Sequence, residues 1–194
     1  AATTVAGAEA SPYPGGSIWR ATAEISAGAH RYVLSVSGSS SQAYTFSVTA
    51  KAGSRTHITL IAGTAGLYGG TNPTATVNLN DGAVSSVSNV AASGAVNLGG
   101  GWWRLWITVT PSSSGSSGPS IALNNGSGTS YTGNNSFLLL AGAAISPGTP
   151  LTAFERTDAI QRIWDYSGKG RHATVGSTSA VDTNDPQRIV DANG

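Results

Sequence analysis

The sequence predicts an all-β fold, and among all-β folds a two-sheet antiparallel β-sandwich of the jelly-roll type. Short runs in which apolar and polar residues alternate recur from residue 17 to residue 145, and this alternation is typical of strands that bury one face. Residues that favour turns separate the runs, and no clear helical periodicity precedes residue 157. A two-sheet jelly roll is favoured because it protects most of the strand edges in such a chain.

The expected strands can be assigned in chain order. Residues 44–50 alternate most cleanly, with Tyr44, Phe46 and Val48 on one side and hydroxyl side chains on the other. Asn80-Asp81-Gly82 is a strong turn signal and predicts a hairpin between its flanking strands. The remaining expected strands are residues 17–25, 31–37, 57–62, 74–79, 84–90, 99–110, 120–123 and 137–145.

The run from residue 99 to residue 110 is the most informative, because it holds three of the five tryptophans. Since strand side chains alternate between faces, this run has a core face and an opposite face. The core face holds Trp103, Leu105, Ile107 and Val109. The opposite face holds Trp102, Arg104, Trp106 and Thr108. That second face either lies beneath a neighbouring segment or forms a platform for a flat ligand.

Composition narrows the classes of partner. The 194 residues carry a net charge of +1, and only 10% of them are charged. Without a cluster of Lys and Arg, the chain has no electrostatic surface for nucleic acid or for an anionic membrane, so a neutral partner is expected. The absence of cysteine excludes disulfides and thiolate metal sites.

Catalytic chemistry has little support in the sequence. A glycosidase needs two carboxyl groups about 5–9 Å apart, yet Asp81 is the only acidic residue between Ile25 and Phe154. A pair formed by Glu24 and Glu155 is the remaining arrangement of that kind. The three histidines lack the spacing of a metal site. We therefore expect a protein without enzymatic activity.

Five short motifs carry a resemblance to a known family. In chain order they are YTFSVTAKAG (residues 44–53), NLNDG (78–82), GWWR (101–104), GA (142–143) and PLTAFERT (150–157). Together they resemble the jelly-roll module of virion and tail proteins of tailed bacteriophages, which is related in shape to carbohydrate-binding modules. The resemblance implies that residues 1–156 form this module, in a virion or extracellular protein.

The sequence departs from the family pattern around the GA motif. The family tends to carry a tryptophan before this pair and Gln-Leu-Glu after it, where this chain has Ala141 and Ala144-Ile145-Ser146. No ligand role is therefore transferred to these positions. Jelly-roll modules often hold a structural calcium ion near their chain ends, for which Glu24 and Glu155 are the candidate ligands. No other cofactor is expected.

A second resemblance begins after residue 157. The run WDYSGKGRHA (residues 164–173) is similar to the opening of a laminin-G or concanavalin-like lectin domain. It implies that residues 157–194 are a linker followed by the truncated start of a second β module. In the alternative, this tail docks on the first domain through Trp164 and Ile189.

Two functions follow from these observations. The first is a non-catalytic carbohydrate-binding module for a polysaccharide or cell-surface glycan, because indole faces stack on sugar rings. Its site would comprise Trp102, Arg104 and Trp106, with Tyr68 and Tyr131 at the rim. The second is an architectural domain of a virion protein without a sugar ligand, whose aromatic face is covered by the tail, by a virion neighbour or by a second copy.

Overall fold

The computed structural model describes most of the first 148 residues. The described ranges are residues 2–4, 10–13, 16–34, 36–148, 162–163 and 173–174. The chain separates into two units, Ala1–Leu151 and Thr152–Gly194. In the second unit, β16 (Arg162–Ile163) pairs antiparallel with β17 (Ala173–Thr174). The boundary expected at residue 157 and the expected nature of the tail lie outside the described residues.

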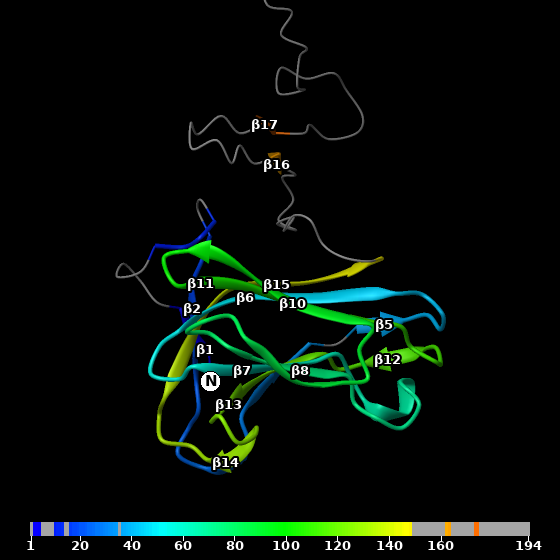
Figure 1. The fold of residues 1–194 in the computed structure, drawn as a ribbon, viewed down its shortest axis with the longest axis horizontal. Helices are drawn as coiled ribbons and strands as arrows, with labels where there is room; N and C mark the ends of the chain where they lie inside the picture. The colour runs from blue at the N-terminus through cyan, green and yellow to red at the C-terminus, as the bar shows by residue number, and fades with distance from the viewer. Residues whose placement is uncertain are drawn as a thin grey trace, which may run out of the picture. The chain divides into compact units, whose positions relative to one another are not determined.

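The first unit consists of antiparallel sheets packed against one another, which confirms the predicted fold class (Figure 1). The six-stranded sheet has the order β1 (Ala2–Thr4), β2 (Trp19–Thr22), β15 (Phe137–Pro147), β6 (Tyr44–Ala52), β11 (Trp102–Val109) and β10 (Ala92–Gly99). The five-stranded sheet has the order β4 (Arg31–Val33), β13 (Ser120–Asn124), β7 (His57–Ile61), β8 (Thr74–Asn78) and β9 (Val84–Ser88). Two small pairs complete the unit, β5 (Val36–Gly38) with β12 (Gly115–Ser117) and β3 (Ala27–Ala29) with β14 (Ser130–Thr132).

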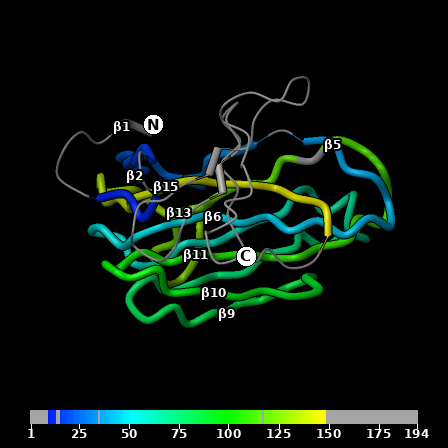
Figure 2. Tube along the Cα trace, turned by 90° about the horizontal axis from the view of Figure 1, so that it is seen from above, coloured from blue at the N-terminus to red at the C-terminus, as the bar shows by residue number. Residues whose placement is uncertain are grey.

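Eight of these strands give the jelly-roll arrangement. They form two four-stranded layers with the orders β2-β15-β6-β11 and β4-β13-β7-β8. Strand β10 extends the first layer beside β11, and strand β9 extends the second layer beside β8. These two added strands contact one another. Figure 2 shows them side by side along one edge of the sandwich. This edge is therefore built by strands that lie outside the eight-stranded frame.

The hydrophobic core lies between the two large sheets. Its largest fully buried apolar side chains are Phe46, Val48, Ile58, Leu60, Val77, Leu105, Ile107, Leu123 and Leu138. They come from both sheets, as the alternation of apolar residues predicts. In β11 the predicted core face is confirmed, because Leu105, Ile107 and Val109 are buried and Trp103 packs against the core.

The predicted hairpin turn at Asn80-Asp81-Gly82 is also confirmed, since it joins β8 to β9. The amide of Gly82 donates to the carbonyl of Asn78 at 2.8 Å, and Asp81 Oδ1 accepts from the amide of Ala83 at 2.9 Å. Gly82 has a φ of +75° and the Trp103 indole lies against its Cα, so a side chain there is excluded both by conformation and by space.

Several boundaries differ from the sequence-based expectation. The expected strand at 31–37 is divided into β4 and β5, and the expected strand at 17–25 is limited to β2. Strand β10 was not predicted, because its Gly, Ala, Ser and Asn residues have low strand propensity. The only helix among the described residues is a 3-10 turn, η1 (Ala65–Leu67). In that part of the chain, no helix has the length and apolar character needed to cross a membrane.

Replacing Leu105 by alanine tests the assignment of the core. Leu105 is fully buried, so we expect Leu105→Ala to lower the free energy of unfolding by about 2–5 kcal/mol. Leu34, which is 38% exposed, provides the matched control, and Leu34→Ala should change the free energy of unfolding by less than about 0.5 kcal/mol. Urea unfolding followed by far-UV circular dichroism measures both values. Equal losses for the two variants would contradict the assignment.

Candidate functional site

The candidate site is the outer face of the six-stranded sheet, which we define as the side turned away from the five-stranded sheet. The pairing of β11 with β6 places Arg104 opposite Thr49 and Trp106 opposite Ser47. The side chains that these two strands contribute to the outer face are Thr45, Ser47, Thr49, Lys51, Trp102, Arg104, Trp106 and Thr108. The predicted group of Trp102, Arg104 and Trp106 is therefore brought together on one face.

Most of this face is closed to solvent. Trp102 is only 3% exposed and Arg104 is 8% exposed, whereas Trp106 is partly exposed. The sequence left two arrangements open for this face, and a contact with a neighbouring segment is the one found at Trp102. A platform of two accessible indoles beside a guanidinium is not formed.

The segment Ala10–Tyr13 contributes to this burial. The indole Nε1 of Trp102 donates a hydrogen bond to the carbonyl oxygen of Ala10 at 3.1 Å. The hydroxyl of Tyr13, whose side chain is 9% exposed, lies 2.6 Å from the hydroxyl of Thr49 on β6. Large aromatic residues with a polar atom find such partners when they are buried. The sequence carried no signal that this segment lies on the sheet.

Trp106 lies against a glycine of the neighbouring strand. Gly94 of β10 is its cross-strand partner, and a Cβ atom added to Gly94 would lie 2.6 Å from Cζ2 and 3.0 Å from Nε1 of the indole. The indole therefore occupies the space that a side chain at Gly94 would fill. An aromatic residue that covers a glycine across a strand pair stabilises the sheet at that point. The sequence analysis missed this close approach because it did not predict β10, and a glycine within a strand is a signal for such an approach only once the strand is recognised.

Hydroxyl groups occupy the other end of the outer face. Thr45 Oγ1 lies 2.9 Å from Thr108 Oγ1 and donates to the carbonyl oxygen of Gly148, also at 2.9 Å. Ser47 is buried, and its hydroxyl has no hydrogen-bond partner among the described residues. Both the segment before β2 and the residue after β15 thus bond to the same face.

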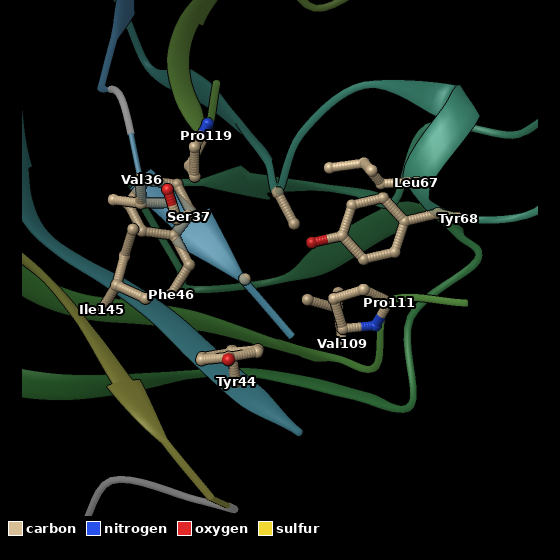
Figure 3. Close-up of a pocket in the computed structure, with 12 residues that line it drawn as sticks. Val36, Ser37, Tyr44, Phe46, Leu67, Tyr68, Val109, Pro111, Pro119 and Ile145 are labelled. Atoms are coloured by element: carbon tan, nitrogen blue, oxygen red, sulfur yellow. The ribbon is translucent and has the colours of Figure 1, made fainter. Parts of the chain in front are cut away.

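Tyr68, expected at the rim of the site, lies elsewhere. It follows η1 and is 9% exposed. Its ring lines a small pocket together with Tyr44 and Phe46 of β6 (Figure 3). This pocket has a volume of about 50 Å³, well below the roughly 300–1,000 Å³ of typical ligand sites. The pocket has room for a few water molecules at most.

Tyr131, the other expected rim residue, lies on β14 between His30 and Arg55. Its ring centroid is 4.7 Å from that of His30, and the Arg55 guanidinium lies 4.7 Å from the ring on a cation–π contact. Burial raises the pKa of Tyr131, and the charge of Arg55 partly offsets this rise. Arg55 also bonds to Ser136 and Asn134. This cluster therefore fastens the loop that follows β14 to the loop between β6 and β7.

Of the two candidate calcium ligands, Glu24 alone lies among the described residues. Glu24 is exposed, and Glu155 lies outside the described residues. In the described ranges, no group of three or more His, Asp or Glu side chains is arranged to hold a metal ion. The structural calcium ion stays an untested prediction.

The described ranges contain two carboxylates, Glu24 and Asp81. Asp81 accepts hydrogen bonds from Asn78 and Ala83 within the hairpin turn, which is a structural role. The ring nitrogens of His30 and His57 bond to the carbonyl oxygen of Tyr131 and to the hydroxyl of Thr56, respectively. A pair of carboxylates placed for acid–base work is absent from this part of the chain.

Comparison with known proteins adds no family assignment. No family model matches the chain, and no curated protein matches it.

The contact between Trp106 and Gly94 predicts that the effect of Gly94→Ala on the unfolding free energy depends on whether the tryptophan is present. In the wild-type background, Gly94→Ala displaces the indole, so we expect a loss of about 1 kcal/mol or more in unfolding free energy. In the Trp106→Ala background the space is empty, and Gly94→Ala should be neutral or stabilising by up to about 1 kcal/mol. Thermal and urea unfolding of the four proteins measure this coupling. If the effects of the two substitutions on the unfolding free energy were additive, the indole would not be packed on Gly94.

Proposed function

We propose that the first unit is an architectural module, a rigid spacer or assembly domain without catalytic activity. The observation that carries this proposal is that the chain's own residues bond to the outer face. Trp102 is bonded to Ala10, and Tyr13 lies within hydrogen-bond distance of Thr49. These contacts use the polar atoms that a ligand would otherwise engage, so the aromatic residues here act as internal packing.

The way the chain enters and leaves the sandwich also supports this proposal. The chain leaves through β15, which is paired with β2 on one side and with β6 on the other. Gly148, directly after β15, accepts a hydrogen bond from Thr45. At the other end, Ala10–Tyr13 is fastened over β6 and β11 before the chain enters β2. A module whose strand β15 is paired on both sides, and whose segment before β2 is bonded to central strands, is suited to carry load between neighbouring parts of a longer structure.

The sequence resemblance supports a biological setting for this role. Its five motifs resemble a jelly-roll module of phage virion and tail proteins, and the second resemblance implies that a further β module follows along the chain. We therefore propose a virion or extracellular location, with virion neighbours or further copies of the chain as partners.

A carbohydrate-binding module is the second candidate, and one observation favours it. Trp106 is partly exposed on the outer face, and the neighbouring Val96, opposite Arg104, is 53% exposed. An indole and an aliphatic side chain on a stiff sheet offer a small apolar surface to a sugar ring. This surface is smaller than the predicted platform, because it lacks Trp102 and Arg104.

Titration with neutral and uronic-acid oligosaccharides separates the two candidates. We expect no binding heat and no change in tryptophan fluorescence for the full chain, and the same silence for Trp106→Ala. Saturable binding that Trp106→Ala abolishes, with the fold retained by circular dichroism, would support the carbohydrate-binding candidate instead.

A second variant tests whether Ala10–Tyr13 is a fixed cover or a displaceable lid. Tyr13→Ala should lower the unfolding free energy by roughly 3 kcal/mol, because it removes a buried aromatic side chain and its contact with Thr49. It should not create glycan binding. Binding gained by Tyr13→Ala without loss of stability would contradict the architectural proposal.

A further inference from the structure

The free edge of the six-stranded sheet is formed by β10. This strand is hydrogen-bonded to β11 and ends the sheet. Within the part of the chain that the structure describes, no hydrogen bond reaches β10 from its other side. An antiparallel strand directs half of its backbone N–H and C=O groups toward each side. The outward groups of β10 are therefore available for pairing with another strand.

From Ala92 to Asn97 this edge lacks the features by which proteins usually protect an edge strand. Its sequence, ASGAVNLG from Ala92 to Gly99, contains no charged residue and no proline. Lysine, proline, bulges and short length are the common protective devices. The pairing of β10 with β11 is regular from Ala92 to Asn97 and shifts only between Asn97 and Gly99. A six-residue stretch of β10 thus remains straight enough to pair.

The other described edges are protected. Strands β1 and β4 have three residues each, and β4 begins with the exposed Arg31. Strand β9 is interrupted by a register shift against β8, and Ser86 within it has a φ of +48°. Such a break bends the strand and prevents continuous pairing. The contrast singles out β10 as the edge that is built to accept a partner.

Exposed apolar side chains accompany this edge. On β10 itself Val96 is 53% and Leu98 is 39% exposed, and Val87 of the adjacent β9 is 50% exposed. A soluble domain rarely keeps such residues together at an unprotected edge unless something covers them. A strand added beside β10 would cover Val96 and Leu98 and satisfy the free backbone groups.

We propose that β10 pairs antiparallel with β10 of a second copy of this chain. Pairing about a two-fold axis sets residue i of one copy opposite residue j of the other and residue j opposite residue i, so the edge meets a second edge of the same composition. This is unfavourable for a charged edge, but β10 carries no charge, and the whole chain carries only +1. The two six-stranded sheets would then form one continuous sheet across the dimer. The inference rests on the edge alone and does not depend on whether the outer face binds a glycan.

Light scattering coupled to size-exclusion chromatography of the full chain tests the proposal over a range of protein concentrations. We expect a concentration-dependent dimer for the wild type. Val96→Lys places a lysine on this edge in both copies, which is a common device that prevents edge pairing, so it should weaken dimerisation by at least tenfold. The matched control is Val33→Lys on edge strand β4, where the valine is 61% exposed. This variant should dimerise as the wild type does.

Amide hydrogen exchange of the wild type gives an independent readout that needs no variant. Exchange of alternate amides within Ala92–Asn97 should slow as the protein concentration rises, while exchange in β4 should not change. A chain that stays monomeric, a dimer that Val96→Lys and Val33→Lys weaken equally, or a dimer without added protection in β10 would each overturn the proposal. Pairing of β10 only with a strand of a different protein would overturn it as well.

Discussion

The structure depends on β6, a central strand that is buried on both faces. It lies between β11 and β15, and Phe46, Val48 and Ala50 on its inner face are at most 2% exposed. Thr45, Ser47 and Thr49 on its outer face are each 1% exposed. Antiparallel sheets commonly leave one face to solvent, so a covered outer face needs partners for its hydroxyl groups. Tyr13, Thr108 and Gly148 supply these partners for the two threonines.

The same use of neutral hydroxyl and amide groups extends to the five-stranded sheet. Thr59 and Thr76 contact one another across β7 and β8 at 2.8 Å, and the side-chain amide of Asn124 donates to Thr59 at 2.9 Å. Such cross-strand pairs stabilise a sheet without any charge. Only 10% of the residues in this chain are charged. Its two large sheets therefore use neutral cross-strand contacts of this kind. The low charge has a second effect, because it leaves the edge strand β10 without the lysines that usually prevent pairing.

The sequence allowed prediction of the features that depend on local periodicity. The fold class, the core face of β11 and the turn at Gly82 all follow from alternation or from turn chemistry, and the structure confirms them. The cover over Trp102 could not be predicted, because it depends on a contact with Ala10 across 92 positions of sequence. Alternation identifies which residues share a face but carries no information about what lies above that face. Tyr68 and Tyr131 were assigned to a common rim, but their positions depend on long-range contacts, with the core for Tyr68 and with His30 and Arg55 for Tyr131.

Trp106 shows why partial exposure of an aromatic residue is weak evidence for a ligand site. An indole that covers a glycine on the neighbouring strand must stand on the surface of the sheet, so some of its area faces solvent whatever its function. What distinguishes a brace from a platform is the surface beneath the ring, and here that surface is the backbone of Gly94. The packing of Trp106 on Gly94 therefore gives this tryptophan a structural role, which is to stabilise the sheet. It also holds an edge strand of small, uncharged residues in register with β11, and a strand held in this way presents its free side as a straight pairing surface.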